Sequence, residues 1–266
     1  MELIILGTGN AMATKCYNTC FALRNGQEYF LVDAGGGNGI LRQLENARIP
    51  CENIHHIFVT HGHTDHVLGV VWVIRKIAML MESQRYSGMA FVYCHDVLVE
   101  MLDTFCRMLL PAKLLKFVGD GIRLVEVQEG DSIRALDMDV SFFDIRSTKA
   151  KQFGFRAILP DGKKLVCLGD EPYNEANKPY VEGADWLLSE AFCLFEDREN
   201  FKPYEKHHST ALDAGRLAQS LGAKRLILYH TEDTNLSQRK QRYADEAGSV
   251  YDGEIWVPED LERIRL

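Results

Sequence analysis

The sequence predicts an α+β fold of four layers, in which two β-sheets lie inside and helices cover them on the outside. Short apolar runs bounded by turn residues recur along the whole chain, and segments of helical periodicity stand between them. No low-complexity linker divides the 266 residues, and no short-period repeat is present. We therefore expect a single domain over residues 1–266.

The expected strands are short apolar runs that end at turn residues. Gly7-Thr8-Gly9 ends the first run, and Asn25-Gly26 and Asp161-Gly162 are typical of tight hairpins. The expected strands cover residues 3–6, 19–23, 29–32, 54–60, 89–94, 122–127, 137–145, 153–159, 164–168, 186–189 and 225–229.

Helical spacing of apolar residues predicts the helices. Val70, Ile74 and Ile77 recur at this spacing in the longest of them. Pro111 closes another helix, and Gly222 is typical of a helix C-terminus. The expected helices cover residues 39–46, 67–85, 97–109, 210–221 and 236–247.

Charge and cysteine content narrow the class of protein. The formal net charge is −8, whereas a protein that grips nucleic-acid phosphates usually has a basic face, so a structured nucleic-acid partner is not expected. The longest apolar stretch is interrupted by Arg75 and Lys76 and is too short to span a membrane. Seven scattered cysteines without a CxxC pair, and an N-terminus without signal-peptide features, indicate a reduced, cytoplasmic location.

Four potential metal ligands stand within six residues, directly after an apolar strand. They are His61, His63, Asp65 and His66. Imidazole and carboxylate together suit zinc, iron or manganese. A surface run of polar residues is the alternative, but three of only nine histidines in six positions make it a poor explanation. The motif therefore predicts a metal-binding hydrolase site.

One short segment cannot complete a metal shell, so further ligands are expected at other strand ends. Asp170 follows the apolar run 165–168, and His230 follows 226–229. Taken alone, each residue is equally well an ordinary loop residue. Taken with the histidine motif, both are predicted as ligands.

At this point the chain resembles a known family, the metallo-β-lactamase-fold hydrolases, and within it the ribonuclease Z-like branch. The resemblance covers nearly the whole chain and implies two mixed sheets flanked by helices. It rests on Leu6-Gly7-Thr8-Gly9, Val32-Asp33-Ala34-Gly35, the His61 to His66 motif, Gly169-Asp170, Ser189-Glu190-Ala191-Phe192, His208-Ser209-Thr210-Ala211 and His230.

The resemblance implies a role for each candidate residue. One or two ions are implied, Zn²⁺ first, with Mn²⁺ or Fe as alternatives. The catalytic residues are Asp65, which accepts a proton from water, and His208 with Glu190, which assist the leaving group. The implied ligands are His61 and His63 for the first metal, Asp65, His66 and His230 for the second, and Asp170 as the bridge.

The sequence departs from the family where a third histidine of the first metal is expected. Residues 144–155 contain no histidine, and Arg146 or Thr148 occupies the expected place. Three readings stay open: only the second site is filled, His95 substitutes, or the first metal binds with extra water. For His95 an ordinary role at a helix start is favoured. Arg146 is a candidate for binding an anionic substrate group.

Two more departures concern the substrate. Ribonuclease Z enzymes carry a long arm that grips transfer RNA before the bridging Asp, and the segment from Thr148 to Asp170 is too short to contain it. Ser189 stands where ribonuclease Z has a histidine. The chain is thus similar to ribonuclease Z without matching it fully.

The sequence therefore favours a metal-dependent hydrolase, phosphodiesterase-like, that acts on a small or unstructured substrate by metal-activated water. A ligand-binding protein of the same fold without turnover is an alternative, and a ribonuclease Z-type tRNA endonuclease is less favoured. A redox role ranks third among the functional classes, after hydrolysis and ligand binding. The di-iron relatives with such a role prefer Glu at the position where this chain has His63. A homodimer is possible, although the apolar helix over residues 67–81 is better explained as core.

Overall fold

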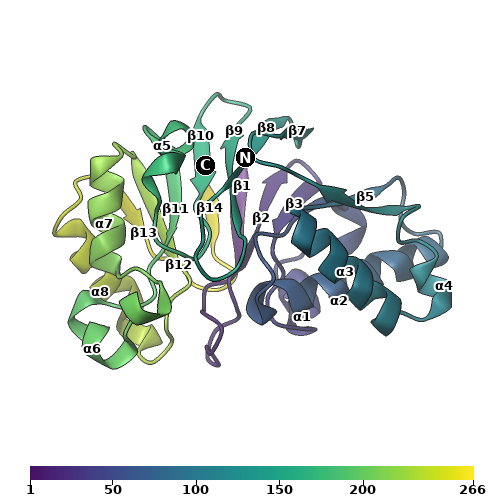
Figure 1. Ribbon diagram of the computed structural model, residues 1–266, viewed down its shortest axis with the longest axis horizontal. Helices are drawn as coiled ribbons and strands as arrows, with labels where there is room; N and C mark the ends of the chain where they lie inside the picture. The colour runs from purple at the N-terminus through teal and green to yellow at the C-terminus, as the bar shows by residue number, and fades with distance from the viewer.

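The computed structural model describes residues 1–266. In it two β-sheets pack face to face, and helices cover their outer faces (Figure 1). Each sheet contains seven strands. The predicted four-layer α+β fold is therefore confirmed.

The first sheet is mixed. Its strands from β14 to β3 pair antiparallel, and those from β3 to β6 pair parallel. In spatial order the strands are β14 (Arg263–Arg265), β1 (Glu2–Gly7), β2 (Cys20–Asn25), β3 (Glu28–Val32), β4 (Ile54–Phe58), β5 (Ala90–Cys94) and β6 (Ile122–Glu126).

The second sheet is built in the same way. Its strands from β7 to β10 pair antiparallel, and those from β10 to β13 pair parallel. In spatial order the strands are β13 (Glu254–Trp256), β12 (Arg225–Tyr229), β11 (Trp186–Glu190), β10 (Lys164–Cys167), β9 (Phe153–Ile158), β8 (Met138–Asp144) and β7 (Ser132–Ala135).

The helices divide between the two outer faces. Those beside the first sheet are α1 (Gly39–Asn46), α2 (Thr64–Glu82), α3 (Asp96–Leu109) and α4 (Ala112–Leu115), and those on the side of the second are α5 (Lys178–Val181), α6 (Arg198–Phe201), α7 (Ala211–Ser220) and α8 (Leu236–Gly248). No helix is both long and apolar enough to cross a membrane.

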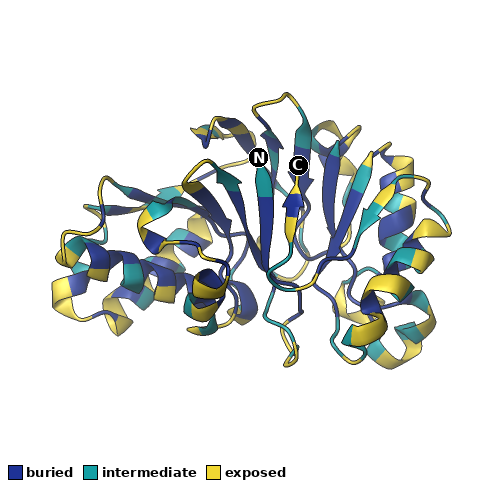
Figure 2. Ribbon diagram, turned by 180° about the vertical axis from the view of Figure 1, so that it is seen from behind, coloured by how far each residue is buried: buried dark blue, intermediate teal, exposed yellow.

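Three hydrophobic cores separate the four layers. One lies between the first sheet and α1–α4, one between the sheets, and one between the second sheet and α7 and α8. Figure 2 shows the strands buried and the outer helix faces exposed. In the central core the ring of Phe58 lies 4.9 Å from Phe142 and 5.7 Å from Phe155, between ring centroids. Because this core takes residues from both halves of the chain, we propose that residues 1–266 fold as one domain.

Most expected elements are present with ends shifted by one to three residues. The elements without a prediction are the shortest ones, namely β7, β13, β14 and the four-residue helices, in which no periodicity can develop. β14 pairs antiparallel with β1, with Leu3 opposite Ile264, so the two chain ends lie close together (Figure 1).

The long helix α2 begins at Thr64, three residues earlier than expected. The backbone N–H groups of His66 and Val67 donate to the carbonyl of His63, which closes the first turn. A carboxylate in a first turn is favourable near the positive end of the helix dipole, and Asp65 supplies it. Half of the histidine motif is therefore helix rather than loop. Val70, Ile74 and Ile77 are fully buried, which confirms that this helix is core.

The start of α2 is held against the loop after β3 by a close approach at Gly69. The Gly69 N–H donates to the carbonyl of Gly35 at 2.8 Å, and a Cβ at position 69 would lie 1.8 Å from the carbonyl oxygen of Ala34. Only glycine allows this distance. The contact fixes where Asp65 and His66, one turn earlier, point.

We predict that Gly69→Ala lowers the free energy of unfolding by about 1–3 kcal/mol, because the methyl group forces α2 away from the loop. Urea denaturation measures this change. Gly37→Ala is the matched control, because a Cβ at position 37 meets nothing within 4 Å. Equal stability of the two variants would contradict the prediction.

Candidate metal centre

The candidate site lies where the carboxyl ends of parallel strands from both sheets meet. His61 comes three residues after β4, Asp170 three residues after β10, and His230 directly after β12, while Asp65 and His66 lie in the first turn of α2. The carboxyl ends of parallel strands share one edge of a sheet, so residues far apart in the sequence come together there. The structure thus gathers the candidates that the sequence named at separate strand ends.

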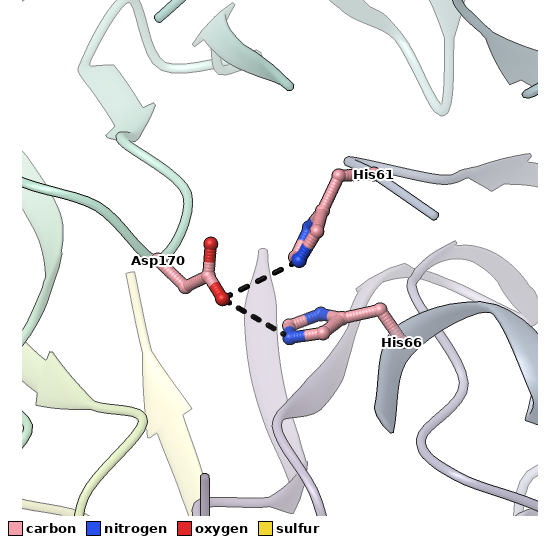
Figure 3. A group of neighbouring side chains, drawn as sticks. All are labelled: His61, His66 and Asp170. Carbon is pink, nitrogen blue, oxygen red and sulfur yellow. Dashed lines mark ion pairs between the residues drawn. The ribbon is translucent and has the colours of Figure 1, made fainter. Parts of the chain in front are cut away.

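One carboxylate oxygen is the centre of the arrangement. Asp170 Oδ2 lies 3.4 Å from His61 Nε2, 3.5 Å from His66 Nε2 and 3.4 Å from His230 Nε2. Figure 3 shows His61 and His66 pointing at this carboxylate from the side of the first sheet. All four residues are buried.

Three overlapping groups of residues bring their ligand atoms within 4.8 Å of one another, and the third of them is Glu190, His208 and His230. The first group is His61, His66 and Asp170, and the second is Asp65, His66 and His230. Asp65 Oδ2 lies 3.4 Å from His66 Nε2 and 3.6 Å from His230 Nε2. His63 adjoins the first group, with its Nδ1 2.9 Å from His61 Nε2.

The donor set fits a divalent cation. The Nε2 atoms of His66 and His230 are buried without any hydrogen-bond partner. Buried polar atoms are normally paired, and an unpaired one costs about 1–3 kcal/mol. Imidazole nitrogens next to two carboxylate oxygens are the ligands of zinc and similar metals. The orphaned nitrogens and the carboxylates beside them are therefore a set that a cation completes.

The pKa values of the cluster also indicate a site for a cation. Burial by itself raises the pKa of both carboxyl groups, but neighbouring imidazoles outweigh it, so the pKa of Asp65 and that of Asp170 fall below their usual values. Burial lowers the pKa of His66, yet the neighbouring carboxylates, that of Asp33 first, raise it well above the usual value. The site thus holds negative charge that a bound cation would balance.

Asp33 supports the site from behind and was known from the sequence only as part of a family motif. Its Oδ2 lies 2.8 Å from His66 Nδ1 and accepts from the Thr60 hydroxyl at 2.7 Å, while its Oδ1 accepts from the Thr60 N–H at 2.8 Å. A carboxylate on Nδ1 fixes the proton there and leaves Nε2 free for a metal. Asp33 and His230 both have left-handed backbone, with φ of 55° and 58°. Such strain in non-glycine residues is concentrated at functional sites.

Glu190 and His208, predicted as a pair, are a pair. Glu190 Oε2 lies 2.7 Å from His208 Nδ1, and Glu190 Oε1 accepts from the Ser209 N–H at 2.7 Å. The ring of Phe192 stacks on His208 with 4.7 Å between centroids. Burial raises the pKa of Glu190 well above its usual value and lowers the pKa of His208 to about 4, so both groups favour their neutral forms.

The helix after this pair, α7, begins with a capping box. Thr210, not Ser209, caps α7: its hydroxyl accepts from the backbone N–H of Asp213, and the Asp213 carboxylate accepts in return from the Thr210 N–H. Threonine with an acidic residue three positions later is the usual capping box. Ser209 is left to hold Glu190 through its backbone.

Arg146 is not brought to the site. Its backbone is left-handed, with φ of 63°, and its guanidinium lies 3.5 Å from Asp144 and contacts Glu129. The cations that do line the pocket are Lys149 and Lys206. Lys149 lies in the loop between β8 and β9 and Lys206 ends a three-residue 3-10 helix, and neither segment has a periodic pattern by which the sequence could single it out.

His95 and Gln152 lie close behind the cluster. His95 is buried beside Phe153, with 5.7 Å between ring centroids. It belongs to none of the ligand groups. It is the N-cap of α3, in agreement with the favoured prediction of an ordinary role at a helix start. Gln152 is 1% exposed, and its side-chain nitrogen contacts Asp170 Oδ1 and lies 2.9 Å from His61 Nδ1. Gln152 is thus the residue of the histidine-free segment that reaches the cluster, and neither Arg146 nor Thr148 does.

Part of the cluster, namely His63, Asp65, Asp170 and His230, lines an open pocket of about 360 Å³. Its walls combine acidic, basic and aromatic groups. They are formed by Asn10, Ala11, Met12, His63, Asp65, Lys149, Asp170, Phe192, Phe201, Lys206, His208, His230, Glu232, Asp233 and Thr234.

Known proteins with this fold and similar sequence define the class. Ribonuclease Z from Thermococcus sibiricus is 26% identical over 306 aligned positions, which cover 100% of this chain and 96% of that protein. Ribonuclease Z from Methanothermobacter thermautotrophicus is 28% identical over 277 positions, covering 86% of each chain. The metallo-β-lactamase-fold protein YhfI from Bacillus subtilis has a TM-score of 0.78 at 20% identity, covering 99% of this chain and 98% of that one. Human tRNase Z, short form, has a TM-score of 0.75 at 22% identity, covering 100% and 99%.

The fold and the relatives therefore define a metallo-β-lactamase-fold hydrolase of the ribonuclease Z-like branch, as the sequence predicted. Within this class, a family model described as anti-Pycsar protein Apyc1 matches residues 1–248. The chain belongs to that family.

We predict that Asp33→Asn weakens metal binding about 10–100-fold, because an amide no longer fixes the proton on His66 Nδ1. Competition with a chromophoric chelator measures the affinity. Asp161→Asn, at the exposed tip of the β9–β10 hairpin, is the control and should leave the affinity unchanged. An Asp33→Asn variant that binds metal as tightly as the wild type would show that the carboxylate has no such role.

Proposed function

We propose that this protein is a zinc-dependent phosphodiesterase that acts on a small or unstructured phosphodiester. The observation that carries the proposal is the convergence of three imidazole nitrogens on Oδ2 of Asp170, which lines the pocket. With Asp65 beside it, this is a ligand set for metal-assisted hydrolysis. Mn²⁺ and iron remain alternatives to zinc, because the same ligands suit them.

In this proposal Asp65, His66, His230 and Asp170 would hold one ion. His61 and His63, with Asp170 shared, would hold the other. A bound metal supplies a water molecule of lowered pKa and a Lewis acid for the phosphoryl oxygens.

Asp65 is proposed as the group that accepts the proton of the attacking water. It is buried, lines the pocket, and is held by His66 and His230 on Oδ2. These contacts lower the pKa of Asp65, so it is ionised and able to orient a water through a hydrogen bond.

Lys149 and Lys206 are proposed to hold the phosphodiester at the pocket wall. The Lys149 ammonium donates to the carbonyl of Lys206 at 2.7 Å, and the Lys206 ammonium lies 5.3 Å from the centre of the Phe192 ring. Two cations on one wall suit a phosphate that faces the carboxylates lining the pocket. They replace Arg146 as the proposed substrate-binding residues.

His208 is proposed to protonate the leaving oxygen with the proton that the Glu190–His208 pair holds: His208 donates its Nε2–H while the neutral carboxyl group of Glu190 gives its own proton to Nδ1. Its Nδ1 is bound to Glu190, which leaves Nε2 as the ring nitrogen for the substrate. The stacked ring of Phe192 holds the imidazole plane in place. A carboxyl group and a stacked ring together position a general acid without a further conformational change.

We propose a small substrate because this chain lacks the arm with which a larger substrate would be held. The chain from β9 through β10 to Asp170 is a short hairpin with no added arm. The alignment with ribonuclease Z from Thermococcus sibiricus is longer than this chain, so that relative carries segments that are absent here. A transfer-RNA substrate is therefore disfavoured.

Three further points concern the biological role, the cellular location and the oligomeric state. The family description leads us to propose an anti-Pycsar role exerted through this hydrolysis. All seven cysteines are free, which supports the expected reducing, cytoplasmic location. A homodimer stays a prediction.

We predict that metal removal abolishes hydrolysis and that zinc restores it. The test measures turnover of bis(p-nitrophenyl) phosphate and of a panel of cyclic and linear nucleotide phosphodiesters after dialysis against a chelator and after reloading. Asp65→Asn should lower kcat by about 10²–10⁴-fold, whereas the exposed Asp161→Asn should not. Zinc-loaded wild-type protein that is inactive on the whole panel would overturn the proposed function and favour a ligand-binding protein.

We predict that His208→Ala lowers kcat by about 10²–10⁴-fold for a substrate with a poor leaving group, such as an alkyl phosphodiester. The loss should be much smaller for p-nitrophenyl esters, because nitrophenolate leaves without a proton. His207→Asn is the control, since His207 is exposed and its left-handed backbone (φ 56°) tolerates Asn. An equal loss for both leaving groups would refute the general-acid role.

A further inference from the structure

Gln152 is the residue through which the histidine-free segment meets the candidate metal centre. It directly precedes β9, and its side chain is almost fully buried. Its amide contacts two of the proposed ligands from behind, at Asp170 Oδ1 and His61 Nδ1, away from the atoms that face the pocket. A buried amide in this position can form hydrogen bonds with both ligands and so orient them.

The orientation of the amide is fixed by Asp170. The atom of Gln152 next to Asp170 Oδ1 is the nitrogen. The opposite orientation would set the amide oxygen against a carboxylate oxygen, which is repulsive. The Nε2 group therefore donates one N–H to Asp170, and its second N–H points to His61 Nδ1, 2.9 Å away.

This contact sets the tautomer of His61. A ring nitrogen that accepts a hydrogen bond carries no proton, so a neutral His61 that accepts on Nδ1 has its proton on Nε2. That proton faces His63 Nδ1, 2.9 Å away, which is able to accept it. Metal binding through Nε2 requires the opposite tautomer, with the proton on Nδ1.

Thr60 favours that opposite tautomer. Its hydroxyl donates to Asp33 and lies 2.9 Å from His61 Nδ1, so its oxygen is able to accept the Nδ1 proton. Thr60 and Gln152 therefore compete over one ring nitrogen. The side-chain oxygen of Gln152 is buried without a partner, so the amide also bears the cost of an unpaired acceptor in this orientation.

His66 has no such competition. Its Nδ1 faces the carboxylate of Asp33, which only accepts, so Nδ1 keeps a proton and Nε2 is the nitrogen on the side of Asp65 and Asp170. The two halves of the centre thus differ in their supporting residues as well as in their number of ligands.

We propose that Gln152 makes the two metal positions unequal: by holding His61 in the tautomer with its proton on Nε2, it weakens the His61–His63 position. The position of Asp65, His66 and His230 is the tight one. This inference rests on the metal centre of the proposed function, and it assigns Gln152 as a positioning residue that acts through His61.

The test is zinc binding to the wild-type protein and to Gln152→Met, which keeps the side-chain length and removes both N–H donors. Equilibrium dialysis with metal analysis should give one tight zinc per wild-type chain and a second that is at least about tenfold weaker. In Gln152→Met the weaker site should tighten about tenfold. Thr60→Val, which removes the competing acceptor, should weaken the same site further.

A second readout is independent of metal and of activity. Long-range ¹H–¹⁵N spectra of the histidine rings in metal-free protein distinguish the two tautomers. We expect His61 with its proton on Nε2 in the wild type and on Nδ1 in Gln152→Met, while His66 keeps its proton on Nδ1 in both. Should Gln152→Met not fold, the wild-type spectrum and stoichiometry still decide.

Two equally tight zinc ions in the wild type, a wild-type His61 with its proton on Nδ1, or a weaker second site in Gln152→Met would each overturn the inference. If phosphodiester hydrolysis persists in those cases, the proposed function stands and only the role of Gln152 falls. Protein that binds no zinc and hydrolyses no phosphodiester would overturn both.

Discussion

The carboxylate of Asp170 is buried with little access to water, and the structure around it is organised by that charge. Three imidazoles approach one of its oxygens, and an amide caps the other. A buried charge costs several kcal/mol unless it is paired and hydrogen-bonded. Hydrogen bonds satisfy only part of this cluster, because ring nitrogens of His66 and His230 stay unpartnered. The cluster is consequently a site whose polar groups do not fully balance one another and which a bound cation would complete.

The fold supplies the convergence that this charge requires. Each sheet is antiparallel on one side and parallel on the other, and the parallel halves end at the same edge of the molecule. β4, β10 and β12 deliver their ligands from opposite sides, while α2 brings Asp65 and His66 from its first turn. Gly69 is essential to this geometry because it lets α2 lie on the loop after β3, which contains Asp33. The packing of one helix thereby sets the positions of two proposed ligands and of the carboxylate that orients one of them.

The sequence was informative where local pattern and geometry coincide. His61, Asp170 and His230 each follow an apolar strand, and a side chain at a strand end is placed by the sheet, so their meeting was predictable. Glu190 and His208 were predictable only through family resemblance, since nothing in their own spacing brings them together.

The segment between β8 and β9 shows the opposite case. Its register was not determined by any periodic pattern, and the left-handed backbone of Arg146 takes that side chain toward Glu129 and Asp144. Gln152 gave no signal because a single amide has no preferred spacing. The shortest strands, β13 and β14, were missed because three residues cannot establish a period of two.

An unequal metal centre changes how charge must be supplied to a phosphodiester. The half with Asp65, His66 and His230 adjoins Glu190 and His208, as His230 Nδ1 lies 3.9 Å from Glu190 Oε2. In the proposed mechanism the groups that act on the nucleophile and on the leaving oxygen are thus concentrated on that side. In the proposed unequal centre a weakly held ion on the His63 side would leave the phosphoryl oxygens short of positive charge, which Lys149 and Lys206, both lining the pocket, would supply. Lysine charges are permanent at neutral pH, whereas a weak metal site depends on metal supply. In the proposed centre the lysines would therefore make hydrolysis less dependent on the second ion than it would be with two equal sites.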